Sequence, residues 1–594
     1  MADLQQKKML EKNANLQEFF KPATAIKKPK TDHIQRPFLD PDTNLNHLYD
    51  QAIPTNTDIE LEPEDTTPTI VGLEYLKEKR QIPLGTLIHT NKPYFLPFPP
   101  ITDATYNVWM MLSPMGGGKT NLARALIYYT AKFDSDSINI VFDPMKMEYA
   151  KLALATDTIE KRKHLLNHTA YDPEAGENIT ITIEPDNLQI YHILPRFSLG
   201  REQWNQESLG YEKTYDKTSI DIMKKDGGFI FAEDASKMSE EQLFAALNYR
   251  ETRAEQVIHF YLRAAIRICN NKHGEGDWFI QDLIQVLRDS VKKFATQEEM
   301  DDLGTDEEGE EGKGGLSRVE LQLIEQLEKY KEVGFFVTNE EERSKYCTDF
   351  RLFIQLNKIL VISFLGFRRA DKFGEDIIVG QTDLILERLN EISNEYYDAV
   401  RKVEQNNAAI QDYLKKINKH RPQGQKISFE QAKEDLKEGL RPISTWEDYL
   451  LRKWKVNLWF EESEIFVPRD CPAQNLKKWP CIKRLNDMLS IGRKYGFRNF
   501  CFITQRISKL NTLVFKEISH LFIGPIHGED RDTILSDFGV QKIAFNITDT
   551  NGITRPIALR DIVTTLNKDK HEWIVINKQL KSIAAIRAFE SPCG

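Results

Sequence analysis

The sequence predicts an α/β protein built around a mostly parallel sheet, and three neighbouring segments indicate this class. Asn107–Leu112 (NVWMML) is a short apolar run typical of a buried strand, and a Gly-rich turn follows it. Asn121–Lys132 then has the pattern of a helix, and Ser137–Phe142 (SINIVF) is a second apolar run. Strand, turn, helix and strand in this order are typical of the start of a parallel α/β sheet.

Later parts of the chain are expected to return to the same sheet. The apolar runs that predict these strands are Lys358–Phe364, Val456–Phe460, Phe500–Ile503 and His520–Ile523. We therefore expect one core, assembled from residues 69–199, 351–375 and 452–594. Large helical insertions are expected at 200–350 and 376–451.

Composition limits the class of protein. The chain has 594 residues, of which 40% are apolar and 29% charged, as in soluble globular proteins. It lacks an apolar run of bilayer length, a secretory signal and a CxxC pair, which predicts a cytoplasmic protein without membrane contact. The net charge is −10, but residues 298–315 form an acidic, Gly-rich insert. Nine acidic residues lie between Glu298 and Glu311, so the rest of the chain is close to neutral.

Ser113–Thr120 (SPMGGGKT) has the composition of a phosphate-binding loop. Glycines let backbone N–H groups curl around phosphates, Lys119 would reach the β- and γ-phosphates, and Thr120 would hold Mg²⁺. The alternative is a Gly-rich turn without a ligand, but the flanking strand and helix favour the nucleotide site. We expect ATP with Mg²⁺ to bind. The predicted contacts are Gly116, Gly117, Gly118, Lys119, Thr120 and Asn121.

Hydrolysis also needs a carboxylate for the metal and a group that orients water. Glu461 and Glu462 follow the apolar strand Val456–Phe460 and could supply both, Glu461 at Mg²⁺ and Glu462 at the water. Glu464 follows closely, so the alternative is a solvated acidic loop after the strand.

Two further polar residues are candidates for the site. Gln505 follows the strand Phe500–Ile503, where it could sense the γ-phosphate or the attacking water; the alternatives are a helix cap or an exposed turn. Arg493 lies one element earlier and could complete a neighbouring subunit's site, because a guanidinium pairs phosphate oxygens bidentately. From its spacing alone, Arg493 is better explained as an ordinary surface residue.

Four segments together resemble one known family. SPMGGGKTNLARAL, IVFDPMKMEY, VNLWFEESE and IGRKYGFRNFCFITQRISKL are similar to motifs of the HerA/FtsK superfamily, with HerA the closer match. The resemblance runs from about Leu84 to the C-terminus. It implies a RecA-like, ring-forming ATPase that translocates double-stranded DNA. By this resemblance Lys119 and Thr120 bind phosphate and Mg²⁺, and Glu461 and Glu462 serve the metal and the water. Gln505 is then the polar sensor and Arg493 a finger acting in trans.

The chain departs from the family pattern at several positions. Ser113 replaces the first Gly, Glu461 replaces an Asp, and Ile507 stands where a Pro is usual. Asp143 matches an acidic position without a clear role. The small N-terminal β-barrel of HerA is not recognisable, and residues 66–105 would supply only a remnant of it.

The N-terminal tail, residues 1–68, is predicted to be poorly ordered. Within it Asn13, Leu16, Phe19 and Phe20 resemble the short motif that docks on the sliding clamp. One helical turn would place the apolar side chains on one face. The alternative is a short amphipathic helix that packs on its own domain.

Together these features predict an ATP-driven double-stranded-DNA translocase that acts as a homohexamer in DNA-end processing or repair, with a nuclease partner plausible from the family's habits. One alternative is a viral genome-packaging ATPase, which differs in partner rather than in chemistry. The other is a nucleotide-binding scaffold with impaired hydrolysis, suggested by Ser113 and Glu461.

Overall fold

The fold is described from a computed structural model, in which the chain divides into two units, Met1–Thr67 and Pro68–Gly594. The residues described are 69–88, 92–98, 107–144, 149, 167–172, 177–182, 190–196, 201–205, 210–214, 229–248, 253–290, 318–347, 349–355, 359–364, 372–469, 480–511, 517–537, 544–548, 554–578 and 582–592. The predicted clamp motif and the acidic insert 298–315 lie outside them.

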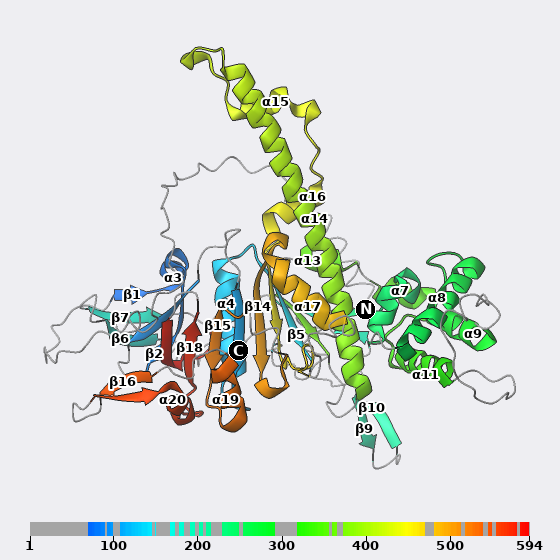
Figure 1. The fold of residues 1–594 in the computed structure, drawn as a ribbon, viewed down its shortest axis with the longest axis horizontal. Coiled ribbons are helices and arrows are strands. Elements are labelled where there is room, and N and C mark those ends of the chain that lie inside the picture. Colours follow the sequence, from blue (N-terminus) through cyan, green and yellow to red (C-terminus); the bar gives the residue numbers. More distant parts are fainter. Residues whose placement is uncertain are drawn as a thin grey trace. The chain divides into compact units, whose positions relative to one another are not determined.

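A twelve-stranded sheet forms the centre of the second unit (Figure 1). In sheet order its strands are β11 (Phe229–Phe231), β8 (Ile190–Pro195), β12 (Ile359–Ser363), β5 (Ile138–Asp143), β13 (Val456–Phe460), β14 (Phe497–Thr504), β4 (Asn107–Leu112), β15 (His520–Ile523), β18 (Glu572–Asn577), β19 (Ser582–Ala588), β2 (Gln81–Leu87) and β3 (Pro93–Pro97). From β11 to β15 every neighbouring pair is parallel, and from β15 to β3 every pair is antiparallel. The predicted α/β class with a mostly parallel sheet is confirmed.

The antiparallel extension was not predicted from the sequence. The segment Glu572–Asn577 (EWIVIN) is wholly buried and pairs with β15 on one side and β19 on the other. Residues 81–97, where only a barrel remnant was expected, instead form β2 and β3 at the end of this extension. Smaller sheets are β1 (Thr69–Val71) with β7 (Glu177–Thr182) and β6 (Asn167–Asp172), β9 (Arg201–Asn205) with β10 (Gly210–Thr214), and β16 (Ala544–Thr548) with β17 (Thr554–Ala558).

The segment 200–350 was expected to be a helical insertion, but it also contains strands. The β9–β10 hairpin lies at its start and β11 joins the main sheet beside β8. The helices described in this segment follow β11: α7 (Glu240–Ala246), α8 (Arg253–His273), α9 (Ile280–Ser290), α11 (Arg318–Val333), α12 (Glu340–Tyr346) and α13 (Phe350–Gln355).

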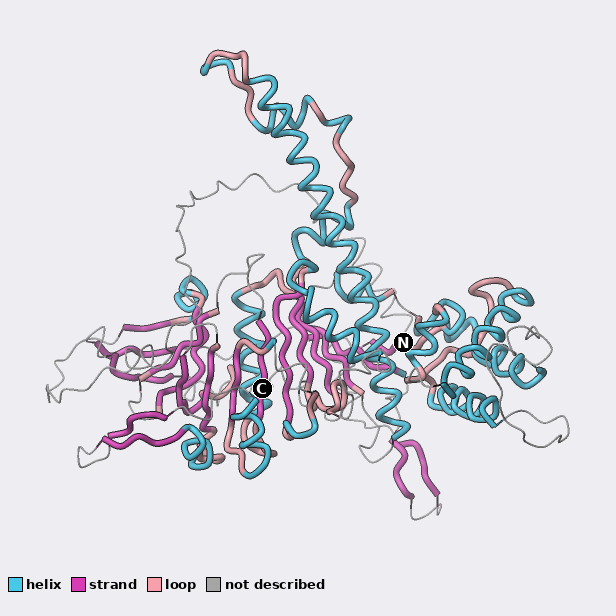
Figure 2. The backbone as a smooth tube through the Cα atoms, in the orientation of Figure 1, coloured by secondary structure: helices cyan, strands magenta, loops and turns pink. Residues whose placement is uncertain are grey.

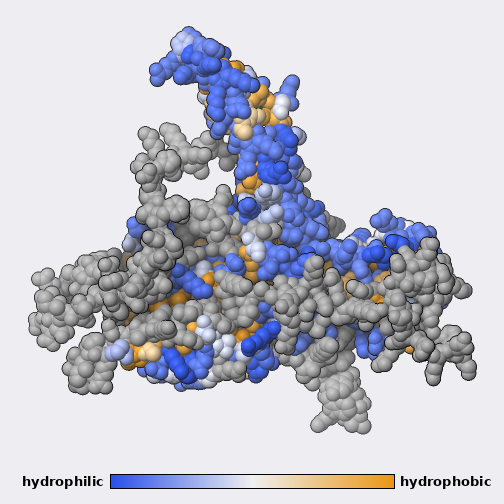
Figure 3. Space-filling view, viewed as in Figure 1, coloured by the Kyte–Doolittle hydropathy of each residue, from blue (hydrophilic) through white to orange (hydrophobic). Residues whose placement is uncertain are grey.

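The second expected insertion, 376–451, is a helical arm. Its main element is α14 (Lys372–Asn418), and the chain returns through α15 (Phe429–Asp435) and α16 (Thr445–Lys453), as Figure 2 shows. A capping box at Ser444 begins α16, because the Ser444 hydroxyl and the Glu447 carboxylate each accept a backbone N–H of the other residue. The visible surface of the arm is largely hydrophilic (Figure 3).

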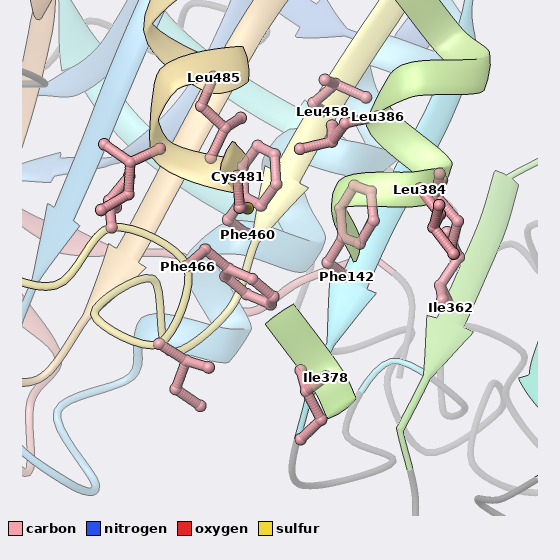
Figure 4. Close-up of a cluster of buried hydrophobic side chains, with 14 of the residues drawn as sticks. Phe142, Ile362, Ile378, Leu384, Leu386, Leu458, Phe460, Phe466, Cys481 and Leu485 are labelled. Carbon is pink, nitrogen blue, oxygen red and sulfur yellow. The ribbon is translucent and has the colours of Figure 1, made fainter. Parts of the chain in front are cut away.

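The central strands of the parallel part, β12, β5, β13, β14, β4 and β15, are buried on both faces. The helix α4 (Lys119–Phe133) packs on one face with Leu122 and Leu126, which belong to the same core cluster as Trp109 of β4. On the other face α14 and α17 (Pro480–Ile491) cover the strands (Figure 4). Parallel neighbours align their aromatic rings there: the centroids of Phe142 and Phe460 are 4.9 Å apart. Helices on both faces explain the continuous apolar runs in the parallel strands.

A row of buried asparagines joins the amino-terminal parts of four strands. Each amide Nδ2 donates to the Oδ1 of the next residue in the order Asn107, Asn499, Asn457 and Asn139, at 3.0, 2.6 and 3.2 Å. The indole Nε1 of Trp459 also donates to Asn139, at 3.1 Å. Because an amide left unpaired in a core is costly, this ladder favours one register for β4, β14, β13 and β5.

Among the residues described, no helix is long and apolar enough to cross a bilayer.

Candidate nucleotide-binding and catalytic site

The candidate site lies at the carboxyl edge of the same four strands. In sheet order the strands are β5, β13, β14 and β4, all parallel. Asp143 ends β5, Glu461 and Glu462 follow β13, Gln505 follows β14, and the predicted phosphate-binding loop follows β4. The sheet therefore places Glu461 and Glu462, which follow β13, two strands from the loop that follows β4. The strand between them is β14, which Gln505 follows. Ligands of open α/β sheets bind at this edge.

The loop at 113–118 has the backbone that a phosphate cradle needs. Gly116 and Gly118 have φ values of 77° and 85°, a region that side chains disfavour. At Gly117 a Cβ would lie only 1.9 Å from Oγ of Ser113. The helix α4 begins at Lys119, directly after the loop, so its N-terminal amides point toward the cradle.

Ser113, the departure at the first loop position, fits this structure without displacing the loop. The residue is wholly buried, and its Oγ has no hydrogen-bond partner among the described residues. It lies between two glycines: a Cβ on Gly524, at the end of β15, would be 2.3 Å from the Ser113 Oγ. The missing side chains at Gly117 and Gly524 thus provide the space that Ser113 takes.

The side chain of Lys119, the first residue of α4, points back into the loop. Its side chain is nearly buried, and Nζ donates to the carbonyl oxygens of Ser113 and Pro114 at 2.8 and 3.1 Å. Thr120 follows in the first turn of α4. Both predicted contacts with phosphate and metal are therefore at the mouth of the cradle.

Asn121, also predicted to contact nucleotide, uses its side chain differently. Its Nδ2 donates to the carbonyl of Phe589 at 2.9 Å, and its Oδ1 accepts the backbone N–H of Ser591 at 2.8 Å. The side chain therefore anchors the C-terminal segment to the first turn of α4. Only the backbone of Asn121 is left for a nucleotide.

Glu461 is a buried carboxylate beside a tyrosine. Tyr149 donates its hydroxyl to Oε2 of Glu461 at 2.7 Å. Burial raises the pKa of Tyr149 well above its usual value, and the charges of Glu461 and Asp143 raise it further. Tyr149 therefore stays protonated and can act as the donor that orients Glu461.

Glu462 and Gln505 meet directly. Nε2 of Gln505 donates to Oε1 of Glu462 at 2.6 Å. Glu462 has a φ of 49°, which is uncommon for a residue with a side chain and is often found at functional sites. The predicted sensor and the predicted water-orienting carboxylate thus form one pair.

The turn 461–466 is not a solvated acidic loop. Glu461, Glu462 and Glu464 are only 4%, 2% and 7% exposed. Glu464 accepts the hydroxyl of Thr504 at 2.7 Å, and Ser463 bonds the carbonyl of Ile503 through both its N–H and its hydroxyl. These bonds tie the turn to β14, so the structure favours a built site over the alternative.

The residues present suit Mg²⁺. A threonine hydroxyl and a carboxylate are oxygen donors, which Mg²⁺ prefers, and it commonly takes only one or two protein ligands besides water and phosphate. Thr120 and Glu461 are the residues that would hold it, and the metal would neutralise phosphate charge.

Arg493 lies in the 3-10 turn Gly492–Tyr495 between α17 and β14. The conformation of its side chain lies outside the described structure, so its predicted role in trans stays a prediction.

Comparison with known proteins relates one part of the core to a known family. Residues 112–339 match the family model described as "Helicase HerA, central domain". This part of the chain is similar to the central domain of the helicase HerA. The HerA match begins at the last residue of β4 and includes the whole phosphate-binding loop. Glu461, Glu462 and Gln505 lie beyond it and are brought to the HerA-type loop by the sheet.

Similar solved structures include VirB4 of Thermoanaerobacter pseudethanolicus and the bacterial conjugative coupling protein TrwB. VirB4 is 10% identical, with 85% of this chain and 96% of VirB4 covered at a TM-score of 0.40. TrwB is also 10% identical, with 88% and 93% covered at a TM-score of 0.40. A genome packaging NTPase, B204 from Sulfolobus turreted icosahedral virus 2, is 12% identical, with 24% and 56% covered at a TM-score of 0.17. No curated protein sequence matches the chain.

Proposed function

We propose that the chain is an ATP-driven translocase of double-stranded DNA of the HerA/FtsK type, working as a homohexameric ring. The observation that carries this proposal is the set of residues gathered at the carboxyl edge of the sheet. There the phosphate-binding loop, two buried glutamates and the Gln505 side chain lie on neighbouring parallel strands. DNA-end processing, with a nuclease partner, is the role we expect for such a motor.

In the proposed mechanism the loop amides, the N-terminus of α4 and Lys119 hold the phosphates of ATP. The Lys119 ammonium exchanges its bonds to the carbonyls of Ser113 and Pro114 for phosphate oxygens. Glu461, oriented by the Tyr149 hydroxyl, would hold the metal together with Thr120.

Glu462 orients the attacking water and receives its proton, as a general base does. The Gln505 amide holds Oε1 of Glu462, which restricts the rotation of the carboxylate. Because Gln505 directly follows β14, the strand next to the loop strand β4, it can sense whether the γ-phosphate is present.

Duplex-stimulated ATP turnover tests the DNA part of the proposal. We expect linear duplex DNA of any sequence to raise turnover, and the effect to weaken steeply with salt, because the contacts are to phosphates. Tight ATP binding with no turnover, with or without DNA, would instead support the scaffold. DNA-stimulated turnover that is coupled to uptake into a capsid would support the packaging motor.

A subunit-mixing experiment tests the ring and the role of Arg493. Lys119→Ala and Arg493→Ala should each be inactive alone. In mixed rings about a quarter of the interfaces join an intact loop to an intact arginine, because the interface is head-to-tail, so activity should partly return. Lys494→Ala, which changes the exposed neighbour, is the matched control and should stay active. No recovery in demonstrably mixed rings would contradict a site shared between subunits.

The tail proposal is tested separately by pull-down with a sliding clamp. Binding should be lost when Phe19 and Phe20 are both changed to Ala, because the two rings fill the apolar pocket. Undiminished capture by the double variant would remove this partner and leave the ATPase proposal intact.

A further inference from the structure

A loop from the antiparallel part of the sheet lies against the phosphate-binding loop. It comprises residues 567–571 and joins α20 (Leu559–Thr565) to β18. A Cβ on Gly116 would be 2.9 Å from Cε and 3.1 Å from Nζ of Lys568. A Cβ on Gly118 would be 2.7 Å from Nδ1 of His571. Two side chains with nitrogen at their ends therefore touch the cradle at two of its glycines.

The loop is built to hold this position. Oδ1 of Asn567 accepts the backbone N–H groups of Asp569 and Lys570 at 2.9 and 3.2 Å, which closes a tight turn. The Glu572 carboxylate accepts the Asn567 N–H at 2.8 Å and pairs with Arg587 of β19. The turn is thus fixed to both β18 and β19.

His571 is placed at some conformational cost. Its φ is 51°, in the left-handed region that non-glycine residues rarely adopt. Its Nδ1 is buried and has no hydrogen-bond partner among the described residues. A strained backbone that presents an unpartnered nitrogen to a ligand-binding loop is typical of functional positions.

Lys568 supplies a positive charge that nothing in the described structure neutralises. The residue is exposed, and no carboxylate among the described residues pairs with it. Its ammonium lies beside Gly116, whereas the Lys119 ammonium lies inside the loop. The two lysines therefore approach the cradle from different elements.

We propose that Lys568 and His571 are additional nucleotide contacts, made in cis, through which the antiparallel part of the sheet closes over the phosphates. Lys568 pairs with a phosphate oxygen, and the imidazole of His571 bonds a phosphate or ribose oxygen. The inference rests on the proposed ATP site and extends it by a second element of the same subunit. It also assigns a role in nucleotide binding to the 567–571 turn, which contains no recognisable sequence motif.

The test is the affinity of the full-length protein for ATP, ADP and adenosine, measured by calorimetry at low and high salt. Lys568→Glu should weaken ATP and ADP binding by about tenfold or more and leave adenosine binding unchanged, since charge-assisted bonds to phosphate are lost. Lys570→Glu is the matched control, because Lys570 is exposed in the same turn. Its substitution changes the net charge by the same amount. Equal losses in the two variants would show a general charge effect and overturn the contact.

His571 needs a variant that keeps the loop. His571→Asn retains a residue that tolerates the left-handed conformation, and His571→Ala does not. If His571 contacts the nucleotide, both variants should bind ATP more weakly than the wild type. The melting temperature of His571→Asn should be unchanged. Unchanged ATP affinity in His571→Asn would show that His571 only supports the loop, and would overturn its part of the proposal.

Lys119→Ala separates this inference from the proposed function. If Lys119→Ala abolishes ATP binding while Lys568→Glu and His571→Asn bind normally, the cis contacts are wrong and the ATP site stands. If Lys119→Ala binds ATP as the wild type does, the proposed site itself fails.

Discussion

The two ends of the same four strands, β5, β13, β14 and β4, are built differently. At the amino ends, four asparagine side chains form a ladder of hydrogen bonds. Each bond joins the amide Nδ2 of one strand to the Oδ1 of the next. At the carboxyl ends lie an ammonium, buried carboxylates and an amide, which are the groups that nucleotide chemistry needs. The ladder repeats one neutral side chain across four strands, whereas the carboxyl edge brings together basic, acidic and amide side chains.

This difference separates stability from activity. Changes at the amino end should alter the free energy of unfolding and leave the chemistry of each folded molecule intact. Changes at the carboxyl end should alter turnover with little effect on folding. Substitutions at Glu461, Gln505, Asn499 and His520 test that separation.

The largest effect is expected at Glu461. Glu461→Ala removes the proposed metal ligand, and kcat/KM for Mg·ATP should fall about a thousandfold, or about 4 kcal/mol in transition-state stabilisation. Glu461→Asp keeps the carboxylate that is usual in the family and should retain part of the activity. Steady-state turnover at several Mg²⁺ concentrations measures both. Wild-type turnover by Glu461→Ala would remove Glu461 from the site.

Gln505→Ala should act on the chemical step alone. Loss of the bond to Glu462 frees the carboxylate to rotate, and kcat should fall about tenfold to a hundredfold with ATP affinity unchanged. Single-turnover kinetics separate the two quantities. A fall in affinity without a fall in kcat would place Gln505 at the phosphates instead.

Asn499→Leu tests the opposite end of the same strand. The substitution keeps the approximate volume but leaves an Asn107 amide hydrogen and the Asn457 oxygen unpaired, which should cost about 2–3 kcal/mol of stability. Thermal unfolding should shift to lower temperature, while kcat per folded molecule is unchanged. An unshifted transition with impaired kcat would contradict the separation of the two ends.

The smallest effect is a dependence on pH at β15, the strand where the parallel and antiparallel parts meet. Burial lowers the pKa of His520 from 6.5 to about 4. Between those values the unfolded chain binds more protons than the folded one, so stability falls as pH falls. From pH 7 to pH 5.5 the loss should be about 1 kcal/mol. His520→Asn should flatten this slope, and an equal slope in both proteins would assign it to other groups.

The motifs at the carboxyl edge could be predicted from the sequence because their chemistry fixes both residue type and spacing. Lys119 and Thr120 follow three glycines, and Glu461 and Glu462 end an apolar strand. The pairing of Gln505 with Glu462 could only be suspected, because it depends on which strands are neighbours.

Other features leave a weaker trace in the sequence. The asparagines occur near the start of four strand segments, NVWMML, INIVFD, VNLWF and FRNFCFIT, which is a usable signal once those strands are known to be adjacent. Lys568 and His571 have no motif at all. They reach the phosphate-binding loop because antiparallel strands from the C-terminal part of the chain extend the sheet next to β15.

If Glu462 is the general base for ATP hydrolysis at the carboxyl edge, its charge is needed for turnover and not for ATP binding. ATP affinity and turnover are compared between the wild type and Glu462→Gln, which keeps the shape of the side chain and removes its charge. We expect unchanged ATP binding and a loss of turnover of about a hundredfold or more in the variant, with DNA present or absent. Turnover by Glu462→Gln at the wild-type rate would contradict this role.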